Sequence, residues 1–375
     1  MDLSREEEKL LNSDDPTLAK CMEILVALGE IFEADRLIPV TSAHVSGISY
    51  GNIGEEGLEW LKGFRAKVKV RTTLNPAGMD LDRWREMGIS EEFFRKQMEV
   101  LEALKRIGAE LTLTCTPYYI NRPSFGEHVA WAESSAVVYA NSVLGARTNR
   151  ESGISALASA IIGKTPRYGL HVKENRAPTI LVRVRGDLDP SYVGYVVGGE
   201  VEGIPIFEFE RRLSDDEMKQ LGASLASTGN VAMFHVKDQT PEWDDFEIPR
   251  EKMEVDGRDI GDECDPDLVA LGCPHLSERE IIFIADIVER LGRPKREMWL
   301  FTSRHVWFRL KGLIERLERR GIRVFRDTCM VVSPATERFD CVLVNSGKAL
   351  TYLPKLRGVR AMFAPTCECV RRAFE

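Results

Sequence analysis

The spacing of apolar and polar positions predicts different elements along the chain. An apolar stripe at helical spacing predicts a helix over residues 16–35, and a short alternating run predicts a strand over 67–72. From residue 273 to the C-terminus, strand-length and helix-length patterns alternate regularly. Strands that alternate with helices favour parallel sheets with right-handed crossovers. The pattern therefore predicts an α/β fold, with parallel or mixed sheets flanked by helices.

The middle of the chain has a less regular pattern. Residues 180–185 and 192–201 have the composition of strands with glycine-rich connections, and the sequence Ser214-x-x-Glu217 predicts a capped helix start. An acidic, proline-containing stretch then suits a surface excursion. We therefore expect two similar α/β units around a more irregular middle region. The predicted boundaries are residues 1–165, 166–265 and 266–375.

Composition and charge exclude several classes of protein. The 375 residues are 43% hydrophobic and 29% charged, which suits a globular protein with a large core. The formal net charge is −8, whereas a nucleic-acid partner would need a basic face. The N-terminal residues are acidic, without the apolar core of a signal peptide, and no apolar run reaches the roughly 18 residues of a membrane span. We therefore expect a cytoplasmic protein with no nucleic-acid or membrane partner.

Two segments far apart in the chain share one pattern. Residues 101–115 and 314–329 each begin as the end of an amphipathic helix, pass through a glycine into a β-rich run, and finish on a Thr-Cys pair. Ligands gather outside the carboxyl ends of strands in open parallel sheets, so we expect Cys115 and Cys329 at the functional edge. Cys273 lies four residues before Ser277, where Ser277-x-x-Glu280 predicts a second capped helix start, and the exposed amides and helix dipole there favour a thiolate. These three thiols predict an assembled inorganic site.

The other cysteines make weaker ligand candidates. Cys21 lies within a helix pattern and suits the core, and Cys264 lies in the acidic stretch. Cys341 begins a predicted strand, so it would point to the opposite edge of its sheet. Cys367 follows the last strand and is the reserve ligand. Eight scattered cysteines are too few for a disulfide scaffold in a chain of this length, so we expect them to be buried, catalytic or metal-bound.

The spacing of the three candidate thiols favours iron and sulfur over zinc. No C-x₂₋₄-C pair joins them, as it does in structural zinc sites, whereas single thiolates from separate elements suit an iron–sulfur cluster. Three thiolates would leave one iron of a four-iron cluster without a protein ligand, free to bind a substrate hydroxyl as a Lewis acid. The matching reaction is dehydration or hydration beside a carboxylate. A structural zinc protein and a non-catalytic iron–sulfur regulatory protein stay open as alternatives.

A set of motifs spans almost the whole chain. They are TSAHVSGISYG at 41–51, TLNPAGMD at 73–80, TCTPYY at 114–119, ESSAVVYANSVLGARTNRE at 133–151, GCPHLS at 272–277, DTCMVV at 327–332 and NSGKA at 345–349. In combination they resemble the large subunit of the aconitase X family. The resemblance implies an aconitase-like fold without the small swivelling domain. It also implies a [4Fe–4S] cluster held by Cys115, Cys273 and Cys329, with one iron not ligated by protein.

The resemblance further implies a partner and a reaction. Archaeal members pair with a separate small swivelling-domain subunit, in a heterodimer or higher assembly, and by resemblance the catalytic base is a serine on that partner. Their substrate is a phosphorylated hydroxy acid: (R)-5-phosphomevalonate is dehydrated to trans-anhydromevalonate 5-phosphate in the archaeal mevalonate pathway of isoprenoid biosynthesis. Other members dehydrate cis-3-hydroxy-L-proline. We therefore expect a hydro-lyase subunit, and the substrate of this chain does not follow from the family alone.

Polar residues in predicted turns and helix ends are candidates for substrate binding. A glycine at position 47 lets backbone amides approach an anion, and Lys348 opens a predicted helix where phosphate can bind. Arg147 and Arg150 can each pair with a carboxylate or phosphate. An ordinary turn, a solvated helix end and a surface lysine explain the same residues. The full candidate set is Gly47, Ile48, Ser49, Asn75, Pro76, Ser134, Ser135, Asn141, Ser142, Arg147 and Lys348. We expect His44 and His275 to be packed and hydrogen-bonded rather than catalytic.

Overall fold

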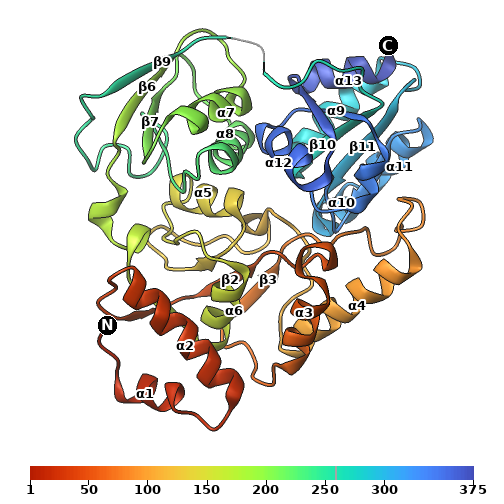
Figure 1. Cartoon of the computed structure of the whole chain (residues 1–375). Coiled ribbons are helices and arrows are strands. Elements are labelled where there is room, and N and C mark those ends of the chain that lie inside the picture. Colours follow the sequence, from red (N-terminus) through yellow and green to blue (C-terminus); the bar gives the residue numbers. More distant parts are fainter. Residues whose placement is uncertain (258–259) are drawn as a thin grey trace.

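The computed structural model in Figure 1 describes residues 1–257 and 260–375. Across these residues the strands form one two-stranded antiparallel sheet and three parallel sheets, and helices pack around them. This arrangement confirms the predicted α/β class. No helix within the two ranges has the length and apolar character that a membrane span requires. The domain boundaries given above stay a prediction.

The N-terminal region is built on a three-stranded parallel sheet of order β3-β2-β4, beside the antiparallel pair β1-β5. Its strands are β1 (Leu37–Pro39), β2 (Ser42–Val45), β3 (Arg71–Leu74), β4 (Ala130–Trp131) and β5 (Lys164–Pro166). Its helices are α1 (Arg5–Leu11), α2 (Pro16–Ile31), α3 (Tyr50–Gly63), α4 (Glu91–Arg106), α5 (Ser134–Ser142) and α6 (Gly153–Ile162). The helix predicted over 16–35 is confirmed as α2. The strand predicted over 67–72 begins later, because the N–H of Val68 bonds to the end of α4, at the carbonyl of Ile107.

The middle region is more regular than the sequence predicts, because it holds a four-stranded parallel sheet of order β8-β7-β6-β9. Its elements are β6 (Ile180–Val184), α7 (Pro190–Glu200), β7 (Pro205–Glu208), α8 (Asp215–Thr228), β8 (His235–Val236) and β9 (Lys252–Val255). The capping box predicted at the start of α8 is confirmed. Figure 1 shows α7 and α8 between this sheet and α12 (Gly347–Arg357) of the C-terminal region.

The strand predicted over residues 192–201 is wrong, since these residues form most of α7. Asp189 caps this helix and Pro190 occupies its first turn, a start signal that the glycine-rich composition hid. The glycines allow α7 to pack closely on α8. A Cβ at Gly194 would lie 2.4 Å from the carbonyl oxygen of Leu221. The glycines that made these residues resemble a flexible strand therefore form the surface of α7 that packs closely against α8.

The C-terminal region holds a five-stranded parallel sheet of order β12-β11-β10-β13-β14. Its strands are β10 (Leu268–Leu276), β11 (Glu297–Thr302), β12 (Arg323–Arg326), β13 (Cys341–Val344) and β14 (Arg360–Phe363). Its helices are α9 (Glu278–Glu289), α10 (Arg304–Arg309), α11 (Lys311–Arg319), α12 and α13 (Thr366–Phe374). Short 3-10 helices lie in connections of the chain: η1 (Pro117–Tyr119), η2 (Gly169–His171), η3 (Lys173–Arg176) and η4 (Pro334–Arg338). Trp299, Phe301 and Phe325 are fully buried and pack in one core with Cys273 and Cys329.

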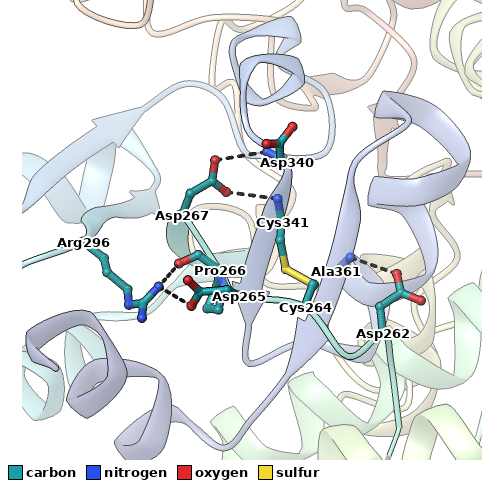
Figure 2. The surroundings of a disulfide bond; sticks show 9 residues. All are labelled: Asp262, Cys264, Asp265, Pro266, Asp267, Arg296, Asp340, Cys341 and Ala361. Carbon is teal, nitrogen blue, oxygen red and sulfur yellow. Dashed lines mark hydrogen bonds and ion pairs between the residues drawn. A yellow bond between two sulfur atoms is a disulfide. The ribbon is translucent and has the colours of Figure 1, made fainter.

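A disulfide joins Cys264 to Cys341, which corrects the expectation that all cysteines are buried, catalytic or metal-bound thiols (Figure 2). The two Cα atoms lie 6.3 Å apart, although the cysteines are separated by 77 residues in the sequence. No local sequence pattern therefore predicts that they pair. Asp267 accepts the backbone N–H groups of Asp340 and Cys341 at 3.1 and 3.0 Å. The bond therefore fixes the segment that enters the five-stranded sheet to the first residue of β13.

Candidate metal centre and active site

Three buried cysteines line one cavity of about 240 Å³. Cys115, Cys273 and Cys329 are 4%, 2% and 5% exposed, respectively. Cys115 follows α4 of the N-terminal region, whereas Cys273 lies in β10 and Cys329 follows β12. The cavity therefore lies where the N-terminal region meets the five-stranded sheet, and it receives thiols from both sides.

The segment that carries Cys115 is extended but is not a strand, so the strand predicted there is wrong. One isolated bridge at Glu110 joins the segment to β3, and the N–H of Thr114 donates to the carbonyl of Leu74 at 2.9 Å. Between these two contacts, Leu113 has a φ of +46°, which interrupts the regular hydrogen bonding that a strand paired with β3 would need. Cys115 nevertheless follows the residue that pairs with the end of β3, at the edge that the sequence predicts.

Cys273 lies inside β10, although the sequence predicts it in the loop before α9. Gly272 has a φ of +115°, and a Cβ there would lie 2.2 Å from the carbonyl oxygen of Phe301, so only glycine fits. The capping box predicted at the start of α9 is confirmed. Cys329 follows β12 across a turn in which Asp327 has a φ of +66°.

The three thiols differ in how readily they ionise. Burial raises the pKa of Cys115 to about 12. The hydrogen bond to Cys329, together with burial, also raises the pKa of Cys273. The pKa of Cys329 is lowered, because its sulfur accepts hydrogen bonds from Cys273 and from the N–H groups of Val331 and Val332. Cys329 rather than Cys273 is therefore the thiol that its surroundings favour as a thiolate.

The spread of the three sulfur atoms suits several metal atoms better than one. Within residues 1–257 and 260–375, one group of three ligand atoms from histidine, cysteine or carboxylate side chains lies within 4.8 Å of one another, and it is Asp80, Asp82 and Asp327. At least one pair of the three sulfurs is therefore further apart than this limit, although Cys273 and Cys329 are close enough to share a hydrogen bond. The sulfur ligands of a single zinc ion would each lie about 2.3 Å from the metal. Soft thiolates at wider spacing fit an iron–sulfur cluster.

A buried polar network forms one wall of the cavity. Glu133, the N-cap of α5, accepts a hydrogen bond from Asn75 at 2.8 Å and forms an ion pair with Lys348. Burial would raise the pKa of Glu133, but Lys348 and Asn75 hold it at about 2. Burial would lower the pKa of Lys348, but Glu133 raises it. His44 bonds to Asn75 at 3.4 Å, and burial lowers its pKa to about 4, so the imidazole is neutral at pH 7.

The cavity brings together some of the candidate substrate residues and leaves out others. Those that line it are Gly47, Asn75, Pro76, Ser134 and Lys348. Those that do not line it are Ile48, Ser49, Ser135, Asn141, Ser142 and Arg147. Ser135 supports the wall, since its Oγ lies 3.2 Å from Lys348 Nζ, whereas Asn141 donates to the carbonyl of Thr148, which does not line the cavity.

Two charged residues outside the full candidate set also line the cavity. Glu133 begins the motif ESSAV, and its position as the N-cap of a small-residue helix is the signal that could have found it. Arg150 lines the cavity, and its guanidinium donates to the carbonyl of Ala226 at 3.0 Å and contacts Asn230. Arg147 instead donates to the carbonyl of His171 at 3.3 Å. Arg150 is therefore the arginine that a ligand in this cavity would meet.

The remaining cysteines and histidines considered in the sequence lie outside the group of three thiols. Cys21 is fully buried in the N-terminal core, which confirms its assignment. Cys367 lines a different cavity, of about 380 Å³, so it does not reach the three thiols. Both ring nitrogens of His44 and both of His275 lie within hydrogen-bonding distance of protein oxygens, which confirms that each is a packed histidine.

Comparison with known families gives one consistent result over the chain. The family described as Aconitase X first domain matches residues 1–174, the second domain matches 178–265 and the third domain matches 266–375. The chain belongs to the aconitase X family. The likeness of this family to aconitase points to an iron–sulfur cofactor, and the donor set of three soft thiolates agrees with that expectation.

Individual members of the aconitase X family resemble the chain along its length. The phosphomevalonate dehydratase large subunit of Methanosarcina mazei is 44% identical, over 100% of this chain and 97% of its own length. The holo-form crystal structure of Thermococcus kodakaraensis aconitase X matches with a TM-score of 0.90 and 40% identity, and the match covers 100% of both chains. The cis-3-hydroxy-L-proline dehydratase of Hypocrea jecorina is 32% identical, and this chain spans 65% of that protein.

Proposed function

We propose that this chain is the large subunit of a two-subunit [4Fe–4S] hydro-lyase that dehydrates (R)-5-phosphomevalonate to trans-anhydromevalonate 5-phosphate. The observation that carries the proposal is the convergence of three buried cysteines on one cavity that also contains Lys348 and Arg150. The relative named for this activity, at 44% identity over the full chain, supports the choice of substrate. This reaction removes a proton from C2 and hydroxide from C3 of the substrate.

Cys115, Cys273 and Cys329 would hold the cluster. When bound through only three cysteines, such a cluster supplies a Lewis acid at the iron without a protein ligand, which makes hydroxide a better leaving group. The N–H groups that stabilise the sulfur of Cys329, and the N–H of His275, which donates to the sulfur of Cys115 at 3.2 Å, suit thiolate ligands. We therefore assign the metal-binding role to these three residues.

The cationic side chains of the cavity would orient the anionic ends of the substrate. Arg150 presents a guanidinium that can form two parallel bonds to a phosphate or carboxylate. Lys348 stays protonated, since Glu133 raises its pKa. Gly47 has a φ of +72° and open space where a Cβ would lie, so backbone groups at this turn can approach a ligand closely. These features favour a substrate with two separated anionic groups.

The catalytic base would come from a small-subunit partner. The titratable groups in this wall are poor bases: the pKa of Glu133 is about 2, and His44 is hydrogen-bonded at both ring nitrogens. The match covers 65% of the relative from Hypocrea jecorina, so about a third of that protein lies outside it and leaves room for an additional domain. We therefore propose that the chain alone is inactive and that a small swivelling-domain subunit completes the site.

The proposal is tested by anaerobic reconstitution of the chain with iron and sulfide, with and without the small subunit. Each preparation is assayed with 5-phosphomevalonate and with cis-3-hydroxy-L-proline. We expect cluster absorbance in the chain alone, and turnover of the phosphorylated substrate only by the pair. Faster dehydration of hydroxyproline would reject the substrate assignment. A cluster without turnover would favour a regulatory protein, and zinc without acid-labile sulfide would favour a structural zinc site.

A further inference from the structure

One imidazole connects all three cysteine segments. His275 lies two residues after Cys273 in β10 and is fully buried. Its Nδ1 lies 3.0 Å from Thr114 Oγ1, and its Nε2 lies 2.8 Å from the carbonyl oxygen of Thr328. Thr114 and Thr328 are the residues immediately before Cys115 and Cys329. The ring therefore spans the gap between two ligand segments while its own backbone belongs to the third.

The partners of the ring fix its tautomer. A carbonyl oxygen can only accept, so Nε2 carries the hydrogen that is donated to Thr328. With that hydrogen on Nε2, the lone pair of Nδ1 accepts from the hydroxyl of Thr114. Thr114 Oγ1 in turn accepts the N–H of Thr116 at 3.1 Å. Thr114 Oγ1 therefore donates to the ring and accepts from Thr116, whose hydroxyl also lies 3.0 Å from it.

The backbone of His275 is held as well. Its N–H donates to the sulfur of Cys115 at 3.2 Å, and its carbonyl accepts from Lys219 Nζ at 3.2 Å. Lys219 is buried on α8 of the middle region and forms an ion pair with Glu280 of α9. A residue anchored at its ring, its N–H and its carbonyl has little freedom to move, which suits it to hold other segments in place.

We propose that His275 is a positioning residue that fixes the spacing of Cys115, Cys273 and Cys329 before the cluster is bound. The inference rests on the proposed cluster, and it adds the residue that prepares the site for it. Segments that are ordered in advance lose less conformational freedom on ligation, and side chains that orient metal ligands commonly change affinity by about 10- to 100-fold. His275 ligates nothing itself.

The test compares the retention of the cluster in reconstituted variants of the full chain. His275→Gln removes the bridge, and Thr114→Val removes only the hydroxyl that bonds to Nδ1 while keeping the volume of the side chain. His235→Gln is the matched control, because His235 is equally buried and its Nε2 bonds to the carbonyl of Arg176 at 2.9 Å, outside the cavity. The measurements are the half-life of visible cluster absorbance with an iron chelator and the circular dichroism of the metal-free chain.

We expect His275→Gln to shorten the half-life by about ten-fold or more, and Thr114→Val to shorten it in the same direction, with unchanged circular dichroism. The double variant should lose no more than the sum of the two single effects in free energy, because both changes break one shared bridge. Wild-type retention in both single variants, or an equal loss in His235→Gln, would overturn the positioning role. A wild-type chain that binds no cluster would instead refute the proposed function.

Discussion

The ion pair between Glu133 and Lys348 gives a prediction that can be worked through quantitatively. Both side chains are at most 9% exposed, so neither charge is well solvated without the other. A carboxyl whose pKa falls from 4.5 to about 2 on folding has its charged form stabilised by about 3 kcal/mol. Lys348→Met removes the main partner and leaves a buried, uncompensated carboxylate. We expect the free energy of unfolding at pH 7 to fall by about 3 kcal/mol.

The pH dependence of this effect has a defined sign. Because folding lowers the pKa of Glu133, its stabilising contribution is complete above about pH 4.5 and is lost as the pH falls toward 2. In Lys348→Met, the hydrogen bond from Asn75 remains but the main opposition to burial is gone, so the pKa of Glu133 rises. The deficit therefore shrinks as the pH is lowered and the carboxyl becomes protonated. The assay is urea unfolding of wild type and variant, followed by tryptophan fluorescence, at several pH values.

A matched double variant separates the charge effect from the loss of a side chain. Lys348→Met combined with Glu133→Gln has no buried charge at this position, so it should recover most of the stability that the single variant loses. A single variant as stable as wild type at pH 7 would refute the reasoning. A double variant no more stable than the single variant would show that packing, rather than charge, is what Lys348 contributes.

Three further predictions test other parts of the site and fold. Arg150→Ala should lower kcat/KM for the phosphorylated substrate by about 10- to 100-fold through a raised KM, as expected for a lost charge-assisted bond, whereas Arg147→Ala should change it little. Cys329→Ser should abolish cluster absorbance after reconstitution, with circular dichroism as the check on folding, and full loading would reject this ligand. Gly194→Val should lower the thermal midpoint by several degrees, because its Cβ would meet the backbone of α8 at 2.4 Å, while Gly199→Ala, which has nothing within 4 Å, should leave the midpoint close to wild type.

Local patterns predicted well those features that local physics determines. The capping boxes at the starts of α8 and α9 need only two side chains and two backbone N–H groups, all from residues three positions apart, and both are confirmed. The edge at which Cys115 and Cys329 lie follows from the order of strands and helices, and the two thiols do share a cavity. The character of the segment before Cys115 was not predictable, because its hydrogen bonds depend on the path of β3.

Features that depend on residues far apart in the chain could not be predicted from the sequence. The disulfide joins residues 77 positions apart, and nothing near either cysteine indicates the other. Glu133 is held as a charged group in the cavity wall because it forms an ion pair with Lys348, which lies 215 residues later in the chain. The residues of α7 have the composition of a strand, and only their contact with α8 explains their glycines. The error at α7 came from weighing composition above the Asp-Pro helix start.

Because the cavity lies between the N-terminal region and the five-stranded sheet, a group bound there would hold the two regions together as well as take part in the chemistry. A cluster held by Cys115 on one side and by Cys273 and Cys329 on the other would join the two halves of the chain, so ligation energy would count toward their association. The lifetime of the whole protein would then follow the supply of iron and sulfide. Oxidative loss of the cluster would weaken the contact between the N-terminal region and the five-stranded sheet and make the chain easier for proteases to cleave. Enzyme that has lost its cluster would then be degraded rather than accumulate.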